Sequence, residues 1–562
     1  MTGYGSNRRW LQAGVLAAGV GAALVGGAGV AAAAPDDTAS ADSPSVSAGR
    51  SAKSSTAVRK PVKVNSSRTA VRSAATRAVA PAGNAPAAAA AVRPARAQAA
   101  VQRTAGAQAL LSASAQPQAA TQAASLGFNL PVGPIRAAIY AAQAFIYGYP
   151  LMEYERVRSV VGTNLNALYN LTTFANPDVD PIWIAIGGGK RPNVDTFYSV
   201  AELDLTNGPV VLSIPDMGDR YFSWQLTDPY TNVSGYIGSN WTGPGPGQYA
   251  ITWTGGPQVD VPGATVVEVP YSSMLILGRT LAGDAADQNI ARALIAQYTL
   301  TPTGATGPNN AVLPANCTGI AYLNGISQAM TQNPPPVPQD DAILATMAKI
   351  GVGVGMQVSD AHLGPLALLA ADLAVKVTQA ILPGLTQLTQ LVSAIQHRGW
   401  AIPNADIGNY GTDYLLRAGV AEVGLVANTQ EEAMYEAGLL DSWYLPLFAI
   451  LPGKKYTLNF AADSLPPAEA FWSVTVYDAN GNLVPNAQGR YSVSSSRPLE
   501  LVYEPDGSIN IIFSQTDPGD PNSNWLALPV GGFSAYLRMY VPDQAAQDRT
   551  WTPPPIRFAG FF

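Results

Sequence analysis

Two regions of alternating apolar and polar residues, at about 176–275 and 450–558, constrain the fold of this 562-residue chain more than any other feature. Successive side chains of a β-strand point to opposite faces of a sheet, so this alternation predicts strands with a buried face. Strands are expected at 209–215, 220–228, 248–254 and 264–269 in the first region, and at 456–460, 471–478, 499–503, 508–513 and 534–541 in the second. The turn sequences Asp478-Ala-Asn-Gly481 and Pro505-Asp-Gly507 are typical of hairpins.

The stretch from Met274 to Trp443 has helical spacing instead. Helices are expected at 288–298, 320–330, 340–350, 361–397 with a break at Pro383, and 410–426, and a further one at 135–162. Asp372 and Lys376 form an i,i+4 pair inside the apolar 361–397 segment, so a packed helix is expected there and not a membrane span. The predicted fold class is α+β: two antiparallel β-sandwich domains joined by a helical middle region. The expected boundaries are 128–275, 276–449 and 450–562.

The first 34 residues are typical of an export signal. Arg8 and Arg9 precede an apolar run at 11–30, and an Ala-rich cleavage region ends at Ala34. The paired arginines also resemble a twin-arginine signal. A secreted or cell-envelope protein without a transmembrane span in its mature form is therefore expected, and an uncleaved anchor is the alternative.

Residues 35–127 are rich in Ala, Ser, Pro and Gln and carry isolated arginines, so a disordered tail is expected there. Residues 1–127 hold 13 Lys/Arg and 3 Asp/Glu, a net +10, which leaves −16 of the total −6 for residues 128–562. The basic tail is expected to act as a spacer, or else to lie along an anionic envelope polymer or lipid. Cys317 is the only cysteine, so no disulfide can form within the chain.

Short motifs along the chain resemble two known families. One set resembles the domain of unknown function 1254 family and lies at Tyr149-Pro150, 192–199, Asp204-Leu205, 208–211, Arg220-Tyr221 and Asp228. The other set resembles the domain of unknown function 1214 family and lies at 465–467, 470–478, 490–492, Asp506-Gly507, 524–526 and Trp551. The resemblance covers about 135–558. It implies two jelly-roll-like β domains joined by helices, and it implies no defined activity or catalytic residues.

Several mechanisms are disfavoured by residue types alone. The two histidines, His362 and His397, both lie in expected helices, so a metal site built on strand histidines is hard to assemble. The sequence has no nucleophile elbow, zinc-protease motif, Cys-x-x-Cys pair or phosphate-binding loop. No metal, cofactor or nucleic-acid partner is therefore expected.

The remaining candidates are acids, arginines and aromatic residues. In the first β domain the candidate ligand-binding residues are Arg191, Asn193, Asp195, Tyr198, Arg220, Tyr221 and Asp228. Asn193 and Asp195 follow Pro192, and an Asx turn is an equally good explanation for them. Arg220 and Asp228 end the same side of one expected strand and are too far apart to pair along it.

In the second β domain the candidates are Trp472, Tyr477, Arg490 and Arg538. Trp472 should point away from Tyr477, with one face in the core and the other toward a groove or the neighbouring domain. Arg538 lies between two tyrosines of its strand, where it is favoured as part of a polar exterior and could otherwise bind a sugar or a carboxylate.

Two functional hypotheses follow. The favoured one is an envelope protein that binds a saccharide or another small polar ligand in a β-domain pocket. The alternative is an exported hydrolase or lyase that uses Asp195 or Asp228 as base or nucleophile, with Arg220 or Tyr198 stabilising charge. Association of identical chains is left open.

Overall fold

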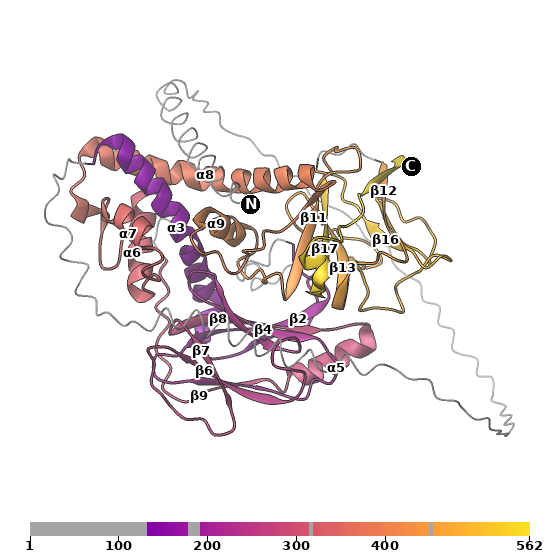
Figure 1. Cartoon of the computed structure of the whole chain (residues 1–562), viewed down its shortest axis with the longest axis horizontal. Helices are drawn as coiled ribbons and strands as arrows, with labels where there is room; N and C mark the ends of the chain where they lie inside the picture. Colours follow the sequence, from indigo (N-terminus) through magenta and orange to yellow (C-terminus); the bar gives the residue numbers. More distant parts are fainter. Residues whose placement is uncertain (1–131, 178–190, 314–317, 449–452, 562) are drawn as a thin grey trace, which may run out of the picture. The chain divides into compact units, whose positions relative to one another are not determined.

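The computed structural model describes residues 132–177, 191–313, 318–448 and 453–561 (Figure 1). The expected export signal, the tail and Cys317 lie outside the described residues. Within them the chain is α+β, as predicted, with its strands in two lobes: lobe 1 at 169–302 and lobe 2 at 400–561.

Lobe 1 consists of two sheets packed face to face. Its strands are β1 (Tyr169–Leu171), β2 (Thr196–Asp204), β3 (Val210–Ile214), β4 (Phe222–Thr227), β5 (Val233–Gly238), β6 (Gly247–Trp253), β7 (Thr265–Val269), β8 (Ser273–Leu281) and β9 (Thr299–Pro302). They form an antiparallel sheet in the order β1-β2-β8-β4-β5 and a sheet in the order β7-β6-β3-β9. Leu212, Trp224 and Ile276 meet in the core between them, and the strands expected at 209–215 and 220–228 form as β3 and β4.

Lobe 2 has the same construction. Its strands are β10 (Trp400–Ala401), β11 (Ala433–Gly438), β12 (Lys454–Phe460), β13 (Ala468–Asp478), β14 (Ser492–Ser494), β15 (Ile509–Ser514), β16 (Asn524–Ala527), β17 (Phe533–Pro542) and β18 (Arg557–Phe561). They form sheets in the orders β10-β11-β17-β13-β14 and β16-β15-β12-β18. Leu458, Trp472 and Leu537 belong to the core of this lobe.

The two lobes are a topological repeat, because each strand of lobe 2 comes nine strands after its counterpart in lobe 1. Both lobes have one parallel pair at the same place, β6 with β7 and β15 with β16. The same turn also follows the equivalent strands β4 and β13. Asp228 Oδ1 accepts from the backbone N–H of Asn232 at 2.9 Å, and Asp478 Oδ1 accepts from that of Asn482 at 2.8 Å. These turns align the two lobes residue by residue.

Helices pack beside the lobes: α3 (Pro134–Val161), α5 (Ala285–Ile295), α6 (Gly319–Gln332), α7 (Asp341–Ala348), α8 (Pro365–Gln396), α9 (Tyr414–Gly424) and the short α10 (Gln544–Gln547). α3 contacts α6, α7, α8 and α9 (Figure 1). The predicted break at Pro383 is wrong, because α8 continues through this residue. Of the described helices, α8 alone has the length and hydropathy of a membrane span, which many core helices also have.

Two further expectations need correction. The stretch 274–443 is not helical throughout, since it contains β8, β9, β10 and β11. Sheet neighbours flank β8 on both sides and its residues are buried on both faces, so its sequence lacks the alternation of a half-exposed strand. The strand expected at 499–503 does not form. The side chain of Asn524 bonds both backbone groups of Val502 instead, and Leu499 is 88% exposed.

Candidate functional site

The outer faces of the two five-stranded sheets meet at a junction between the lobes, where Tyr221 of lobe 1 contacts Phe471 and Tyr540 of lobe 2. Each sheet presents one polar row to this junction. A row consists of a tyrosine, an arginine and a serine on three adjacent strands: Tyr198, Arg279 and Ser223 in the lobe 1 row, and Tyr435, Arg538 and Ser473 in the lobe 2 row. The strands that carry them are equivalent under the repeat, so the two rows are equivalent as well.

Strand alternation fixes the direction of each row. Leu537 and Met539 lie in the core of lobe 2, so Arg538 between them must point to the opposite face. That face was expected to be a solvent-exposed polar exterior. It is not, because lobe 1 covers it and leaves Arg538 only 4% exposed.

Both row arginines are buried without a carboxylate within ion-pairing distance in the described part of the chain. Arg279 lies over the ring of Tyr198 at 5.8 Å, and Arg538 lies over those of Tyr477 and Tyr536 at 5.5 and 5.6 Å. Burial raises the pKa of Tyr477 to about 12, so its phenol is neutral at pH 7. Aromatic rings and neutral acceptors therefore surround two positive charges that no ion pair compensates.

Two buried acids hold the lobes together in a reciprocal arrangement. Asp195, just before β2, accepts from Arg497 of lobe 2 at 3.3 Å. Glu432, just before β11, accepts from Tyr221 and Trp241 of lobe 1, both at 2.6 Å. Asp195 precedes β2, the first long strand of lobe 1, and binds Arg497, which follows the edge strand β14 of lobe 2. Glu432 precedes β11, the first long strand of lobe 2, and binds Trp241, which follows the equivalent edge strand β5 of lobe 1. We call these reciprocal contacts of Asp195 and Glu432 the clasp, and both carboxylates bind residues of the other lobe in it.

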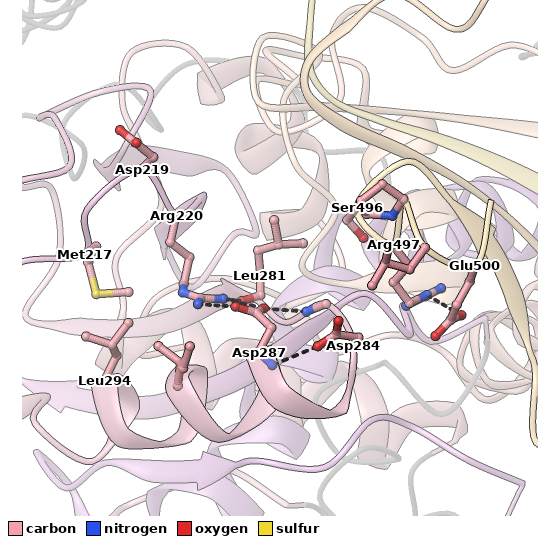
Figure 2. A pocket seen from close by; sticks show the side chains of 14 residues that line it. Met217, Asp219, Arg220, Leu281, Asp284, Asp287, Leu294, Ser496, Arg497 and Glu500 are labelled. Atoms are coloured by element: carbon pink, nitrogen blue, oxygen red, sulfur yellow. Dashed lines mark hydrogen bonds and ion pairs between the residues drawn. The ribbon is translucent and has the colours of Figure 1, made fainter. Parts of the chain in front are cut away.

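A cleft of about 480 Å³ opens beside this clasp. One side is formed by lobe 1, with Met217, Arg220 and Leu281 above α5, and the other by the 496–500 loop of lobe 2. Figure 2 shows the Arg220–Asp287 pair on one side and Arg497 with Glu500 on the other. Because Arg497 lines the cleft and also binds Asp195, this side chain connects the open cleft to the buried junction.

The structure brings seven of the predicted residues to the junction: Arg191, Asn193, Asp195, Tyr198, Tyr221, Tyr477 and Arg538. The 191–195 segment lies against lobe 2. Tyr477 donates to the carbonyl of Pro192 at 2.6 Å, Arg538 donates to that of Arg191 at 2.8 Å, and Asn193 donates to the Tyr540 hydroxyl at 2.6 Å. Asn193 also accepts from the backbone N–H of Asp195, which is the Asx turn given as the alternative.

The other four predicted residues lie elsewhere. Arg220 lines the cleft and is held by Asp287 at 2.5 Å. Asp228 is buried in its turn, and burial raises its pKa to about 6. Trp472 lies in the core of lobe 2, and Arg490 donates to the carbonyls of Ser523 and Glu500.

Sequence reasoning missed the residues that complete the cleft and the rows. Asp284 caps α5 and Asp287 follows in its first turn, a helix-start signal that would have placed this helix at 285 and not at 288. Arg279 lies in the segment expected to be helical, and Arg497 lies in a serine-rich turn. Only strand register, which a single sequence does not contain, shows that Arg279 and Arg538 are equivalent.

Similarity to known proteins agrees with this division into lobes. The model of the family described as protein of unknown function (DUF1254) matches residues 160–302, and that of protein of unknown function (DUF1214) matches residues 449–544. The first match lies in lobe 1 and the second in lobe 2, in the order that the sequence motifs suggested.

The crystal structure of the VPA0106 protein from Vibrio parahaemolyticus is similar to this chain, with 22% identity and a TM-score of 0.55 over 75% of this chain and 100% of that one. At this identity the likeness shows a common fold only. An uncharacterized protein from Burkholderia cenocepacia also matches, with 14% identity and a TM-score of 0.37 over 83% of this chain and 96% of that one. No curated protein matches.

Proposed function

We propose that the protein binds a small polar ligand in the cleft between α5 and the 496–500 loop. The observation that carries this proposal is the volume of about 480 Å³, which lies in the usual range for small-molecule sites. The cleft also lies where two lobes meet, which is a common place for ligand sites. Its walls belong to both lobes, so a bound ligand would contact both halves of the repeat.

The lining indicates what kind of ligand fits. Met217, Leu281 and Leu294 form an apolar wall, and four carboxylates face two arginines: Asp219, Asp284, Asp287 and Glu500 against Arg220 and Arg497. Both arginines are paired already. The ligand should therefore donate hydrogen bonds, through hydroxyl or amino groups, and carry an apolar part. A saccharide can supply the hydroxyls, but no aromatic ring among the described lining residues offers stacking.

Binding is better supported than the alternative of a hydrolase or lyase. Asp195 and Asp228, the acids considered for catalysis, do not line the cleft. Asp287 does line it, but the bidentate bond from Arg220 lowers the pKa of this carboxyl and keeps it charged. A general acid needs the opposite shift.

Export, an envelope location and jelly-roll-like lobes complete the proposal. They rest on the N-terminal sequence pattern and on the family resemblance. Amino-terminal sequencing of the protein recovered from the producing cells tests export, because cleavage near Ala34 would expose a new terminus.

The binding test is a thermal-shift screen of the full chain against sugars, amino sugars and polyols. A ligand that binds the folded state raises the melting temperature by mass action. Ile290→Trp on the exposed face of α5 should fill the cleft and remove this rise. Val266→Trp is the matched control, because Val266 is an exposed apolar residue of the same lobe, 66% exposed, outside the cleft. A rise that survives Ile290→Trp, or no rise with any compound, would contradict the proposal.

A further inference from the structure

The two equivalent rows differ in how their arginines are satisfied. In lobe 1, Arg279 Nη1 donates to Gln225 Oε1 at 2.9 Å and to Asn428 Oδ1 at 3.0 Å, and Nη2 donates to the carbonyl of Val426 at 2.8 Å. In lobe 2, Arg538 Nη2 donates to the carbonyl of Arg191 at 2.8 Å, whereas Nη1 is buried without a partner among the described residues.

One difference between the repeats removes an acceptor that the sheet itself could supply. The turns that follow β4 and β13 place Gln225 of lobe 1 at the position of Thr475 in lobe 2. The amide oxygen of Gln225 reaches Arg279, but threonine has a side chain two heavy atoms shorter and offers a hydroxyl close to its own strand. Lobe 1 therefore supplies an acceptor from its own sheet, beside the one that Asn428 of lobe 2 provides, whereas no described residue of either lobe accepts from Arg538 Nη1.

Three hydroxyls beside Arg538 are also buried and unpartnered among the described residues: those of Ser473, Thr475 and Tyr536. Ser473 is the register partner of Arg538, and Thr475 is that of Tyr536. Direct partners of this kind have Cβ atoms about 4.5–5.5 Å apart, so all four groups occupy one small patch of sheet. The side chains of Ser473 and Thr475 are 0% exposed, Arg538 is 4% exposed and Tyr536 7%.

The patch therefore contains one guanidinium N–H and three hydroxyls around a charge without a counterion. The buried acids of the junction do not neutralise it, since Asp195 pairs with Arg497 and Glu432 accepts from Tyr221 and Trp241. Unsatisfied buried donors and an unpaired buried charge are both costly. An anion that accepts from these donors removes both costs.

We propose that Arg538, Ser473, Thr475 and Tyr536 form a binding site for a small monovalent anion, either a halide or a small carboxylate. Arg538 supplies the positive charge of the site, and the enclosed position between the lobes restricts the size of the anion. The site does not line the cleft and is independent of the function proposed for it. An anion there would fix lobe 2 against the 191–195 segment of lobe 1, so the lobe junction should be stabilised by anions.

The test measures the melting temperature of the full chain at constant ionic strength, with sodium gluconate, whose anion is too bulky for the site, replaced stepwise by sodium chloride or sodium acetate. We expect the melting temperature to rise by a few degrees with the logarithm of the small-anion concentration. A rise with chloride alone identifies a halide site, a rise with acetate alone identifies a carboxylate site, and a rise with both identifies a general small-anion site. No rise with either overturns the proposal.

Two variants locate the effect. Arg538→Gln should abolish the rise. Arg279→Gln removes the equivalent buried arginine, whose donors are already satisfied, so it should lower the melting temperature but keep the rise. If Arg538→Gln does not fold, Ser473→Ala combined with Thr475→Val removes two of the donors and should weaken the anion dependence several-fold. An unchanged anion dependence in Arg538→Gln or in the double variant would show adventitious binding only.

Discussion

Lobe 1 and lobe 2 share one topology and one clasp, yet they use different chemistry at equivalent positions. In lobe 1, Gln225 accepts a hydrogen bond from Arg279. Lobe 2 has Thr475 at the equivalent position, and Arg538 Nη1 has no acceptor in the described structure. The acid of lobe 1 binds a guanidinium, whereas the acid of lobe 2 binds a phenol and an indole. The repeat thus preserves the backbone arrangement and the location of the buried polar groups. The difference identifies Arg538 of lobe 2 as a buried side chain with a donor that the described residues do not bond.

The largest expected effect tests whether the two lobes behave as one folding unit. Trp224 lies in the core of lobe 1 and Trp472 in that of lobe 2, and they are 1% and 5% exposed. Trp224→Ala and Trp472→Ala should each lower the free energy of unfolding by about 3–5 kcal/mol, because each leaves a large cavity.

Calorimetry and tyrosine fluorescence measure whether the lobes separate in these variants. The buried clasp makes contacts in both directions, so we expect one shared transition in each variant. Two separate transitions, with only the altered lobe shifted, would mean that the lobes are independent domains and that the junction contributes little to stability.

The second comparison concerns the two acids of the clasp. Asp195→Asn removes a charge that faces Arg497, whose side chain is 9% exposed and also pairs with the half-exposed Glu500. Tyr221 and Trp241 donate to different oxygens of Glu432. Glu432→Gln keeps one oxygen, which can accept from Trp241, and its new amide group can donate to the Tyr221 hydroxyl. Charged hydrogen bonds contribute more than neutral ones, so we expect losses of about 2 kcal/mol for Asp195→Asn and about 1 kcal/mol for Glu432→Gln.

Urea denaturation of both variants beside the unaltered chain measures this difference. Glu500→Gln is the control, since it changes an acid next to Arg497 that is about half exposed, and it should cost less than either. The reverse order, with Glu432→Gln the more damaging, would show that the second acid depends on its charge after all.

Sequence alone predicted the parts of this fold that have local signals. Alternation gave β3, β4, β12 and β17 because each has one face in a core, and helical spacing gave α3 and α9. It failed at β8, where a strand buried on both faces has no period of two, and at 499–503, where alternation occurs without a neighbouring strand. Both failures come from tertiary contacts that no short window contains.

The candidate residues show the same limit. The 191–199 motif and Arg538 could be singled out by residue type, but whether they faced solvent depended on the other lobe. Arg279 was missed because its importance comes from its register partners, Tyr198 and Ser223. The cleft also combines α5 with a loop about two hundred residues later in the chain, and no spacing rule connects them.

The smallest effect concerns a buried acid of lobe 1 whose equivalent position in lobe 2 is apolar. Glu202 on β2 is 0% exposed, accepts from the Tyr154 hydroxyl at 2.5 Å and has Arg158 Nε at 3.6 Å. The alignment of β2 with β11 places the apolar Leu439 at the equivalent position of lobe 2. Burial raises the pKa of Glu202 to about 8, although Arg158 opposes this shift.

Because the pKa of Glu202 is higher in the folded chain than in the unfolded one, the folded state holds the proton more tightly. Stability from this group is complete below about pH 4.5 and is lost as the pH rises toward 8, by at most about 1.4 kcal/mol per pH unit. Glu436, with its pKa raised by burial to about 7, adds to the same trend. Glu202→Gln should therefore make unfolding free energies measured between pH 5 and pH 8 less dependent on pH, while Glu153→Gln in a partly exposed pair with Arg156 should not. An equally steep decline in Glu202→Gln would place the titrating group elsewhere, and the buried acid would then not distinguish the two lobes.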